Sequence, residues 1–338
     1  FPNLSGAKVL GLDTETKDPE LKEAGPGWGR KKGHIVGVSL AVEDGQSWYF
    51  PINHEVQAEK NMNRDNVFAF LRDALGTDTP KVGANLQYDI GWLLHHDVEV
   101  KGQLYDVQYA EALLDDTAFS YSLESIAGKY LNKGKFSVEL YEWLAKAYGG
   151  RPTAADQGGN IYKSPPSICS RYACDDAVLP IQILQKQWAE LCKNGLVDLF
   201  KMECNLIQIL VRMRMLGMRV NYDKIDTAQI YVQDKIKLLQ TQLNDHAGFK
   251  VAPFSGGDLA RMFNDHKQPF PLTKADNPSF TKDWLKANDY IGAQLVYDIR
   301  RYTKGIGTFI ESAILKKARQ GRIYPSLHPL RGEDGGAV

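Results

Sequence analysis

Asp13 and Glu15 are the residues of this sequence whose type and spacing point most directly to chemistry. They lie two positions apart, directly after the apolar run Val9–Leu12. Because side chains alternate faces along a β-strand, both carboxylates project to the same side. Two carboxylates at the end of a buried strand repel each other and lose hydration, and a divalent cation between them offsets both costs. We therefore expect this pair to hold catalytic metal ions, with later residues completing the site.

Two later stretches carry similar chemistry. Asp89 lies four residues after Asn85, and Asp176 lies four residues after Tyr172, so each pair shares one face of a helix. Each stretch lies near the start of a helix that follows a strand or loop, where α/β folds place their chemistry. Taken singly, each residue has an ordinary alternative role: a surface charge, a helix N-cap for Asn85, a half-buried helical tyrosine for Tyr172. The three pairs in order are more specific than any one of them.

The first half of the chain must position these residues. Residues 8–16, 35–42 and 47–52 have strand patterns, and a turn at Glu43–Gly45 joins the last two into a hairpin. These three strands predict an antiparallel section of a mixed sheet. Strand and helix patterns then alternate, with a short strand at 81–84 and helices at 65–75, 85–95, 106–114 and 122–130. The alternation predicts an α/β domain.

The second half is mainly helical. Glycine and proline concentrate in residues 149–166, which predicts a loop or an inserted flap. We expect a helix over 167–179 that kinks at Pro180, because proline cannot donate to the carbonyl four residues back. Further helical patterns cover 181–216, ending at Gly217, then 223–246 with Asp223 as its cap, 259–263, 281–287 and 293–318.

Composition sets the broad class. The 338 residues allow two domains, and 43% hydrophobic with 24% charged residues is ordinary for a soluble globular protein. No apolar run approaches the ~18 residues of a membrane span, and no signal peptide is recognisable. The four cysteines form no Cys-x-x-Cys pair, which favours reduced intracellular thiols. Residues 219–338 hold 18 Lys and Arg against 13 Asp and Glu, a net charge of +5 that leaves −5 for the rest.

At this point the sequence resembles a known family. Asp13-x-Glu15, Asn85-x-x-x-Asp89 and Tyr172-x-x-x-Asp176 look like the three motifs of the DEDD 3′–5′ exonucleases, in the subtype with tyrosine in the third motif. Residues 121–131 resemble the segment between motifs two and three of the proofreading domain of family A DNA polymerases. Residues 202–221 resemble the helix that leads into the thumb, and residues 321–338 resemble the segment just before the first palm motif. The flap and Pro180 resemble bacteriophage members.

The resemblance implies a ribonuclease H-like exonuclease domain over 1–182, with a mixed sheet flanked by helices, and a mainly helical thumb-like region over 183–338. It implies two Mg²⁺ or Mn²⁺ ions bound by Asp13, Glu15, Asp89 and Asp176. Tyr172 would orient the attacking water. The polymerase carboxylates and the nucleotide-binding helix of the palm and fingers are absent from this sequence, so we expect this chain alone not to polymerise.

The resemblance also implies partners. Thr16, Asn85 and Tyr88 match positions that line the groove for a single-stranded DNA 3′ end, where Tyr88 offers a stacking face. Arg300, Arg301 and Lys304 cluster on a helix of the thumb-like region, where they either grip duplex phosphates or form a solvated face. The rest of the polymerase, its palm and fingers, is the expected protein partner. A cytoplasmic location in a bacterial or phage-infected bacterial cell is implied.

Three functions remain open at this stage. The first is a metal-dependent 3′–5′ exonuclease that forms the proofreading part of a family A DNA polymerase. The second is a DNA-binding wedge with an inactive exonuclease site, which positions DNA for a separate polymerase part; the intact motif residues argue against it. The third is a free-standing RNA-trimming exonuclease of the same superfamily, against which the thumb-like region argues. Relative activity on DNA and RNA distinguishes the last from the first.

Overall fold

The structure is a computed structural model that describes residues 1–133, 137–327 and 329. The chain forms two compact units. The first contains Phe1–Gly217 together with the segment from Tyr324 onward, and the second contains Met218–Ile323. Residues 183–217 therefore belong to the first unit. The expected pre-palm segment covers residues 321–338, of which 328 and 330–338 lie outside the described residues.

A five-stranded mixed sheet forms the centre of the first unit, with strand order β3-β2-β1-β4-β5. The hairpin strands β2 and β3 run antiparallel to their neighbours, whereas β1, β4 and β5 are parallel. The strands are β1 (Leu10–Lys17), β2 (His34–Val42), β3 (Ser47–Pro51), β4 (Lys81–Gly83) and β5 (Leu104–Asp106). The expected mixed sheet with its early hairpin is confirmed, and β5 is a strand that the sequence pattern did not indicate.

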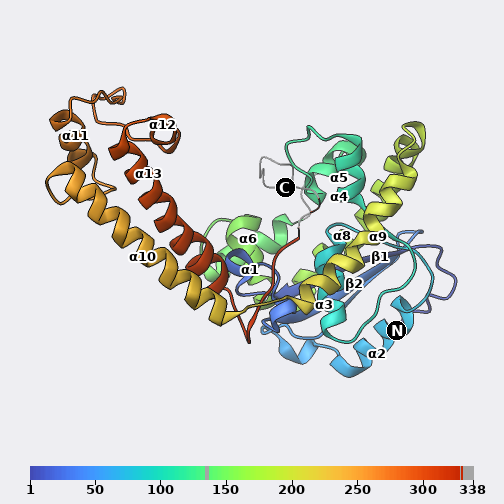
Figure 1. Cartoon of the computed structure of the whole chain (residues 1–338). Coiled ribbons are helices and arrows are strands. Elements are labelled where there is room, and N and C mark those ends of the chain that lie inside the picture. The colour runs from blue at the N-terminus through green and yellow to red at the C-terminus, as the bar shows by residue number, and fades with distance from the viewer. Residues whose placement is uncertain (134–136, 328, 330–338) are drawn as a thin grey trace. The chain divides into compact units, whose positions relative to one another are not determined.

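Helices flank this sheet (Figure 1). In the first unit these are α1 (Leu21–Ala24), η1 (Gly27–Arg30), η2 (Ala58–Lys60), α2 (Arg64–Leu75), α3 (Leu86–His95), α4 (Val107–Leu114), α5 (Leu123–Leu131), α6 (Val138–Tyr148), α7 (Ala154–Gln157), η3 (Gly158–Lys163), α8 (Pro166–Lys193) and α9 (Val197–Leu216). Both faces of β2 are buried, since consecutive residues Ile35 and Val36 are each 0% exposed. The sheet is thus covered on both sides, as expected for an α/β domain.

Gly11 allows α8 to approach the sheet closely. A Cβ at this position would lie 2.0 Å from the carbonyl oxygen of Ala177, which is backbone and cannot rotate away. Only glycine therefore fits where β1 and α8 meet. This close approach brings Asp176, the neighbour of Ala177, to the strand that carries Asp13 and Glu15.

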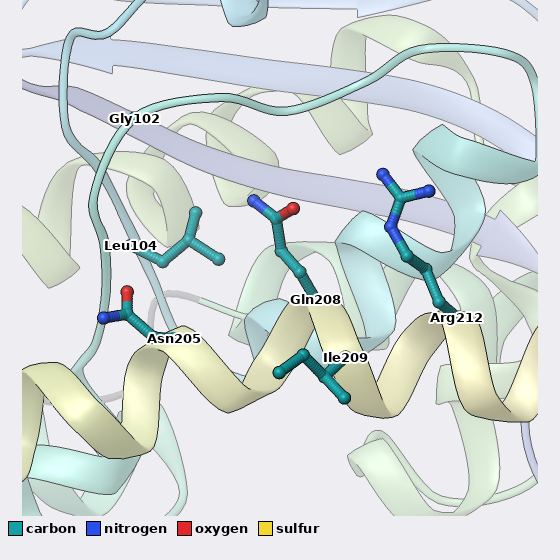
Figure 2. Close-up of a pocket in the computed structure, with 6 residues that line it drawn as sticks. All are labelled: Gly102, Leu104, Asn205, Gln208, Ile209 and Arg212. Carbon is teal, nitrogen blue, oxygen red and sulfur yellow. The ribbon is translucent and has the colours of Figure 1, made fainter.

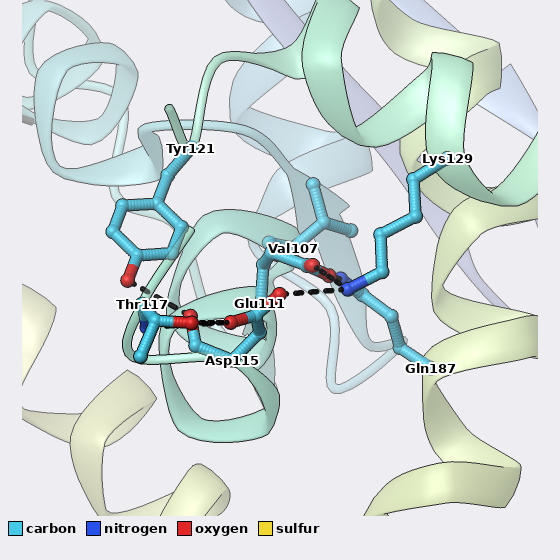
Figure 3. A network of polar contacts seen from close by, with 7 residues as sticks. All are labelled: Val107, Glu111, Asp115, Thr117, Tyr121, Lys129 and Gln187. Atoms are coloured by element: carbon cyan, nitrogen blue, oxygen red, sulfur yellow. Dashed lines mark hydrogen bonds and ion pairs between the residues drawn. The ribbon is translucent and has the colours of Figure 1, made fainter. Parts of the chain in front are cut away.

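A buried polar network ties three helices of the first unit together (Figure 3). Glu111 of α4 accepts hydrogen bonds from Lys129 Nζ of α5 at 2.6 Å and from Gln187 Nε2 of α8 at 3.0 Å. The same Gln187 amide donates to the carbonyl oxygen of Val107 at 3.0 Å. Lys129 also pairs with Asp115 at 3.3 Å. The network holds α8 against α4 and α5.

Several sequence expectations need correction. The expected loop at 149–166 contains α7 and η3, and the helix α6 before it was not anticipated. The helical pattern over 181–216 is interrupted, because Gly195 has a φ of +69°, so α8 ends at Lys193 and α9 begins at Val197. The polar dipeptide Asn194-Gly195, a common turn signal, marks this break in the sequence. The helix α8 includes Pro180 within its length, and the kink expected at this proline stays a prediction.

The second unit is mainly helical, as expected. Its elements are β6 (Met218–Arg219), α10 (Tyr222–Ala247), α11 (Gly256–Asp265), α12 (Lys282–Ala287), α13 (Ile291–Lys304), the π-helix η4 (Gly305–Leu315) and β7 (Arg322–Ile323). A core that includes Leu243, Phe263 and Val296 joins α10, α11 and α13 (Figure 1). The cap of α10 is Asn221, whose side chain accepts from Lys224 N, and not Asp223 as expected. In the described parts of the chain, no helix is both long and apolar enough to cross a membrane.

Candidate active site

Asp13, Glu15 and Asp176 come together at one point. One carboxylate oxygen from each lies within 4.8 Å of the others. Strand β1 carries Asp13 and Glu15 on one face, and helix α8, which packs against β1, carries Asp176. Glu15 is buried, at 6% exposed, and the other two are half-buried. Sequence spacing placed the first pair on one face, and the packing of α8 on β1 adds the third.

The electrostatics of this cluster are unbalanced. Burial raises the pKa of Asp13, Glu15 and Asp176 well above the ordinary range, and in each case repulsion from a neighbouring carboxylate adds to it. For Glu15 the repelling groups are Asp13, Asp176 and Asp89. Carboxylate oxygens that repel one another are the ligands that hard divalent cations prefer. The three residues present therefore fit a divalent metal ion.

Asp89 lies next to this cluster and is held by Thr14. Its Oδ1 accepts from Thr14 N at 3.1 Å and from Thr14 Oγ1 at 2.6 Å. The register pairs Gly11 with Val82, and β4 ends at Gly83, so Thr14 has no strand partner on that side. The Asp89 carboxylate therefore accepts the backbone hydrogen bond of Thr14 that a neighbouring strand would otherwise accept. Burial raises the pKa of Asp89 to about 8, and its charge raises the pKa of Asp13.

Asp106 positions the helix that carries Asp89. Its Oδ2 accepts from Leu86 N at 2.7 Å, at the start of α3, and its Oδ1 accepts from Gln108 N at 2.9 Å, at the start of α4. Asp106 is 0% exposed. Asn85 precedes α3 in a left-handed conformation (φ 63°), is exposed, and makes no side-chain cap. Sequence reasoning missed Asp106; the only available signal was an acidic residue between an apolar stretch and a helix.

Tyr172 lies on α8 one turn before Asp176. Its ring packs near Tyr141, with centroids 6.1 Å apart. Burial raises the pKa of Tyr172 well above its ordinary range, and the Asp176 charge raises it further. A hydrogen bond from Tyr172 in turn lowers the pKa of Asp176, against the larger effect of burial. Tyr172 therefore keeps its proton at neutral pH and acts as a hydrogen-bond donor.

Thr16, near the end of β1, and Tyr88 of α3 form a hydrogen-bonded pair. Thr16 Oγ1 and Tyr88 OH are 2.7 Å apart, and the Tyr88 hydroxyl donates to Asp18 Oδ2 at 3.2 Å. The Asp18 carboxylate also accepts from Gly27 N at 2.9 Å. The loop at residues 25–27 is thus attached to the end of β1 and to α3.

The three basic residues predicted to cluster on α13 differ in their exposure and in their hydrogen-bond partners. Arg300 turns its guanidinium inward, donating from Nε to the Pro253 carbonyl and from Nη1 to the Phe280 carbonyl, each at 2.7 Å. Arg301 pairs with Asp298 at 3.0 Å. Arg301 and Lys304 are exposed. The cluster expected from the sequence therefore offers two surface charges, and its third member braces the second unit.

A separate hollow of about 270 Å³ lies on α9 (Figure 2). No carboxylate lines it, so it is distinct from the cluster of Asp13, Glu15 and Asp176. Its three polar side chains already have partners. Gln208 Nε2 donates to the Val100 carbonyl at 2.9 Å, Asn205 Oδ1 accepts from Gln103 Nε2 at 3.1 Å, and Arg212 pairs with Glu99. Its lining consists of Gly102, Leu104, Asn205, Gln208, Ile209 and Arg212.

Comparisons with known proteins agree with this geometry. A family model of the DNA polymerase A type, described as 3′–5′ exonuclease, matches residues 2–191. DNA polymerase DpoZ of Salmonella phage PMBT28 is 30% identical over 99% of this chain and 53% of its own length. DNA polymerase I of Pseudomonas aeruginosa is 26% identical over 96% of this chain and 35% of its own length.

Another relative and one solved structure extend the likeness over the second unit. The DNA-directed DNA polymerase of Pseudomonas phage M6 is 30% identical over 98% of this chain and 50% of its own length. The POL domain of Pol1 from M. smegmatis, solved in complex with DNA primer-template and dNTP, covers 98% of this chain with a TM-score of 0.65. At 16% identity it shows a shared fold, over 51% of that chain. The present chain spans about half the length of the phage relatives.

Proposed function

Because this chain belongs to the 3′–5′ exonuclease family of DNA polymerases of type A, we propose that it removes nucleotides from DNA 3′ ends as a proofreading exonuclease. The convergence of Asp13, Glu15 and Asp176 carries this proposal. Glu15 is buried and the other two carboxylates are half-buried, and they repel one another, so binding of a divalent cation would be favourable.

We propose Asp13, Glu15 and Asp176 as metal ligands, and Asp89 as a ligand of a second ion. Two divalent ions, Mg²⁺ or Mn²⁺, would supply Lewis acidity to the attacking water and to the leaving 3′-oxygen. Asp13 is suited to bridge two positions, because it is repelled by Asp89 and itself repels Glu15 and Asp176. One oxygen of Asp89 is already taken by Thr14, which leaves its other oxygen for the site.

The remaining residues would orient water and substrate. Tyr172 stays protonated, so its role is to orient the attacking water through a hydrogen bond rather than to remove a proton. Thr16, Asn85 and Tyr88 would line the groove for a single-stranded 3′ end. The Tyr88 hydroxyl is held by Thr16 and Asp18, so its ring has a defined orientation toward an unpaired base.

The wider setting is proposed from the relatives. We propose that residues 1–182 act as the exonuclease domain and residues 183–338 as a thumb-like region of a family A DNA polymerase. The palm and fingers would be the protein partner, in a bacterial or phage-infected cell. In this setting the thumb-like region would contact duplex DNA through the exposed Arg301 and Lys304.

The experiment that tests the proposal uses a single-stranded DNA oligomer labelled at its 3′ end. We expect release of the 3′ nucleotide with Mg²⁺ or Mn²⁺ and none with EDTA. The Asp176→Ala variant should lose the release, and Asp175→Ala is the matched control on the neighbouring position. Retained activity in Asp176→Ala contradicts the metal assignment. DNA binding without any release from the wild-type chain favours the inactive wedge, and faster release from RNA favours an RNA-trimming enzyme.

A further inference from the structure

Tyr49 lies on the same face of the sheet as the catalytic carboxylates. The register pairs Asp13 with Ser39 and Ser39 with Tyr49, and directly paired residues project to one face. Gly37, which is paired with Glu15, leaves the space that the Tyr49 ring fills. A Cβ on Gly37 would lie 2.1 Å from the Tyr49 hydroxyl oxygen. The Tyr49 side chain is thus packed beside Glu15 on the floor of the site.

His54 links the Tyr49 hydroxyl to a segment outside the sheet. The Tyr49 hydroxyl and His54 Nε2 are 2.7 Å apart, and His54 Nδ1 lies 2.7 Å from the Ser164 carbonyl oxygen. A carbonyl can only accept, so Nδ1 carries the proton and Nε2 accepts from Tyr49. His54 is 2% exposed, and its backbone N–H donates to Asn61 Oδ1 at 2.9 Å. Every polar group of the imidazole is therefore committed.

The segment that these residues hold is the start of α8. Ser164 is followed by Pro165 and Pro166, which have no N–H to donate. The Ser164 N–H already donates to the Ile161 carbonyl at 2.9 Å, so the Ser164 carbonyl is the backbone group available to His54. The His54 imidazole supplies the donor. A second attachment lies within the first turn, where Cys169 Sγ is 3.7 Å from the Tyr49 hydroxyl oxygen.

Cys169 connects the Tyr49 contact to the helix face that carries Tyr172 and Asp176. It lies three residues before Tyr172 and seven before Asp176, on the same side of α8. Tyr49, Cys169 and Tyr172 share one apolar cluster. A shift of the first turn of α8 would therefore be transmitted to the Tyr172 hydroxyl, which must be placed to within a fraction of an ångström.

We propose that Tyr49 and His54 are positioning residues for hydrolysis: they clamp the start of α8 at Ser164 and Cys169, and so set Tyr172 and Asp176 against Asp13 and Glu15. This inference rests on the proposed exonuclease function. Neither residue touches the reacting atoms. Both act through α8.

Two substitutions of His54 separate its two hydrogen bonds. His54→Asn retains a donor where Nδ1 lies and loses the acceptor for Tyr49, whereas His54→Gln retains an acceptor where Nε2 lies and loses the donor to Ser164. We expect His54→Gln to lower kcat roughly 10-fold with KM for single-stranded DNA unchanged, because a misplaced group slows chemistry more than binding. His54→Asn should retain at least about one third of the wild-type kcat, as a conservative rescue.

A double-mutant cycle tests whether the effect passes through Tyr172. In a Tyr172→Phe background, His54→Gln should lower kcat by clearly less than the roughly 10-fold expected in the wild-type background, because the part of the loss that passes through Tyr172 is already gone and only the part that passes through Asp176 remains. Full multiplication of the two losses overturns the inference, as does a wild-type kcat in His54→Gln. If His54→Gln does not fold, Tyr49→Phe, which removes one hydroxyl, is expected to lower kcat roughly 3-fold, and no change in it overturns the inference.

Calorimetric titration with Mn²⁺ separates this inference from the proposed function. If the wild-type chain releases no nucleotide, the exonuclease proposal fails by itself. A weaker Mn²⁺ affinity of His54→Gln, by several-fold relative to the wild type, then still supports the positioning of Asp176. Equal Mn²⁺ affinity in the two proteins contradicts it.

Discussion

Two buried carboxylate clusters of the first unit have opposite electrostatics. In the polar network of α4, Glu111 is 2% exposed and is neutralised by Lys129 and hydrogen-bonded by Gln187 (Figure 3). In the cluster of Asp13, Glu15 and Asp176, the charged groups that act on each carboxylate most strongly are other carboxylates. The first cluster is complete within the protein and stabilises it. The second has the charge and ligand types that would suit a cation from solution, which is the reason for proposing it as the functional one.

The largest difference should appear when one carboxylate is neutralised in each cluster. Asp13→Asn is expected to lower exonuclease activity by roughly 10³-fold, because a metal ligand is worth several kcal/mol of transition-state stabilisation. Its free energy of unfolding without metal should stay equal or rise, since repulsion is relieved. Activity on labelled DNA and urea denaturation in EDTA measure both. Loss of stability alongside full activity would reverse the roles of the two clusters.

Removing the carboxylate of the neutralised cluster should act on stability instead. Glu111→Ala is expected to lower the free energy of unfolding by about 2 kcal/mol, because the Gln187 amide and the Lys129 ammonium lose their partner. Urea denaturation measures this change. The exonuclease activity of the folded fraction should remain within about 2-fold of the wild type. The control is Glu139→Ala on α6, whose exposed carboxylate is 3.9 Å from Arg171 and should matter little.

Divalent cations should stabilise the folded protein only through the cluster of Asp13, Glu15 and Asp176. Mn²⁺ in tenfold excess over its dissociation constant is expected to raise the free energy of unfolding by about 1.4 kcal/mol, since it binds the folded state. Thermal unfolding with Mn²⁺ or EDTA measures the shift. The same addition should leave Asp13→Asn nearly unchanged and should still stabilise Glu111→Ala. An equal shift in Asp13→Asn would place the bound ion elsewhere.

The smallest effect is the pH dependence of stability without metal. The folded pKa values of Asp13, Glu15 and Asp176 are raised, so the folded state holds more protons than the unfolded state between their two pKa values. Stability from this cluster is therefore present at acid pH and decreases as the pH rises through the folded values. Asp89, with its pKa near 8, extends this window toward neutrality. We expect a decrease on the order of 1 kcal/mol from pH 5 to pH 8 in EDTA, relative to Asp13→Asn. A wild-type curve parallel to that of the variant would contradict unbalanced charge in the cluster.

The sequence predicted much of the first unit because its elements have strong local patterns. The hairpin around Glu43–Gly45 and the mixed sheet are confirmed, since alternation and turn residues act over a few positions. Prediction from local pattern failed where an element depends on contacts between residues far apart in the sequence. The strand β5 has three residues and is recognisable only beside β4. The break at Gly195 did have a local signal in the dipeptide Asn194-Gly195, but the apolar periodicity on both sides of it favoured one continuous helix. The division of the chain at Gly217 likewise depends on packing.

By itself, the sequence determined that Asp13 and Glu15 share one face of a strand and that Tyr172 and Asp176 share one face of a helix, because backbone periodicity alone decides both. Only the tertiary structure decided which faces meet. Gly11 lets α8 approach β1, Thr14 binds Asp89 where β4 has ended, and Asp106 holds the first turn of α3. These contacts join residues far apart in the chain, and no local spacing encodes them. The charge imbalance on which the proposed cation site depends arises from this packing, since carboxylates separated in sequence repel only once the fold has buried them together.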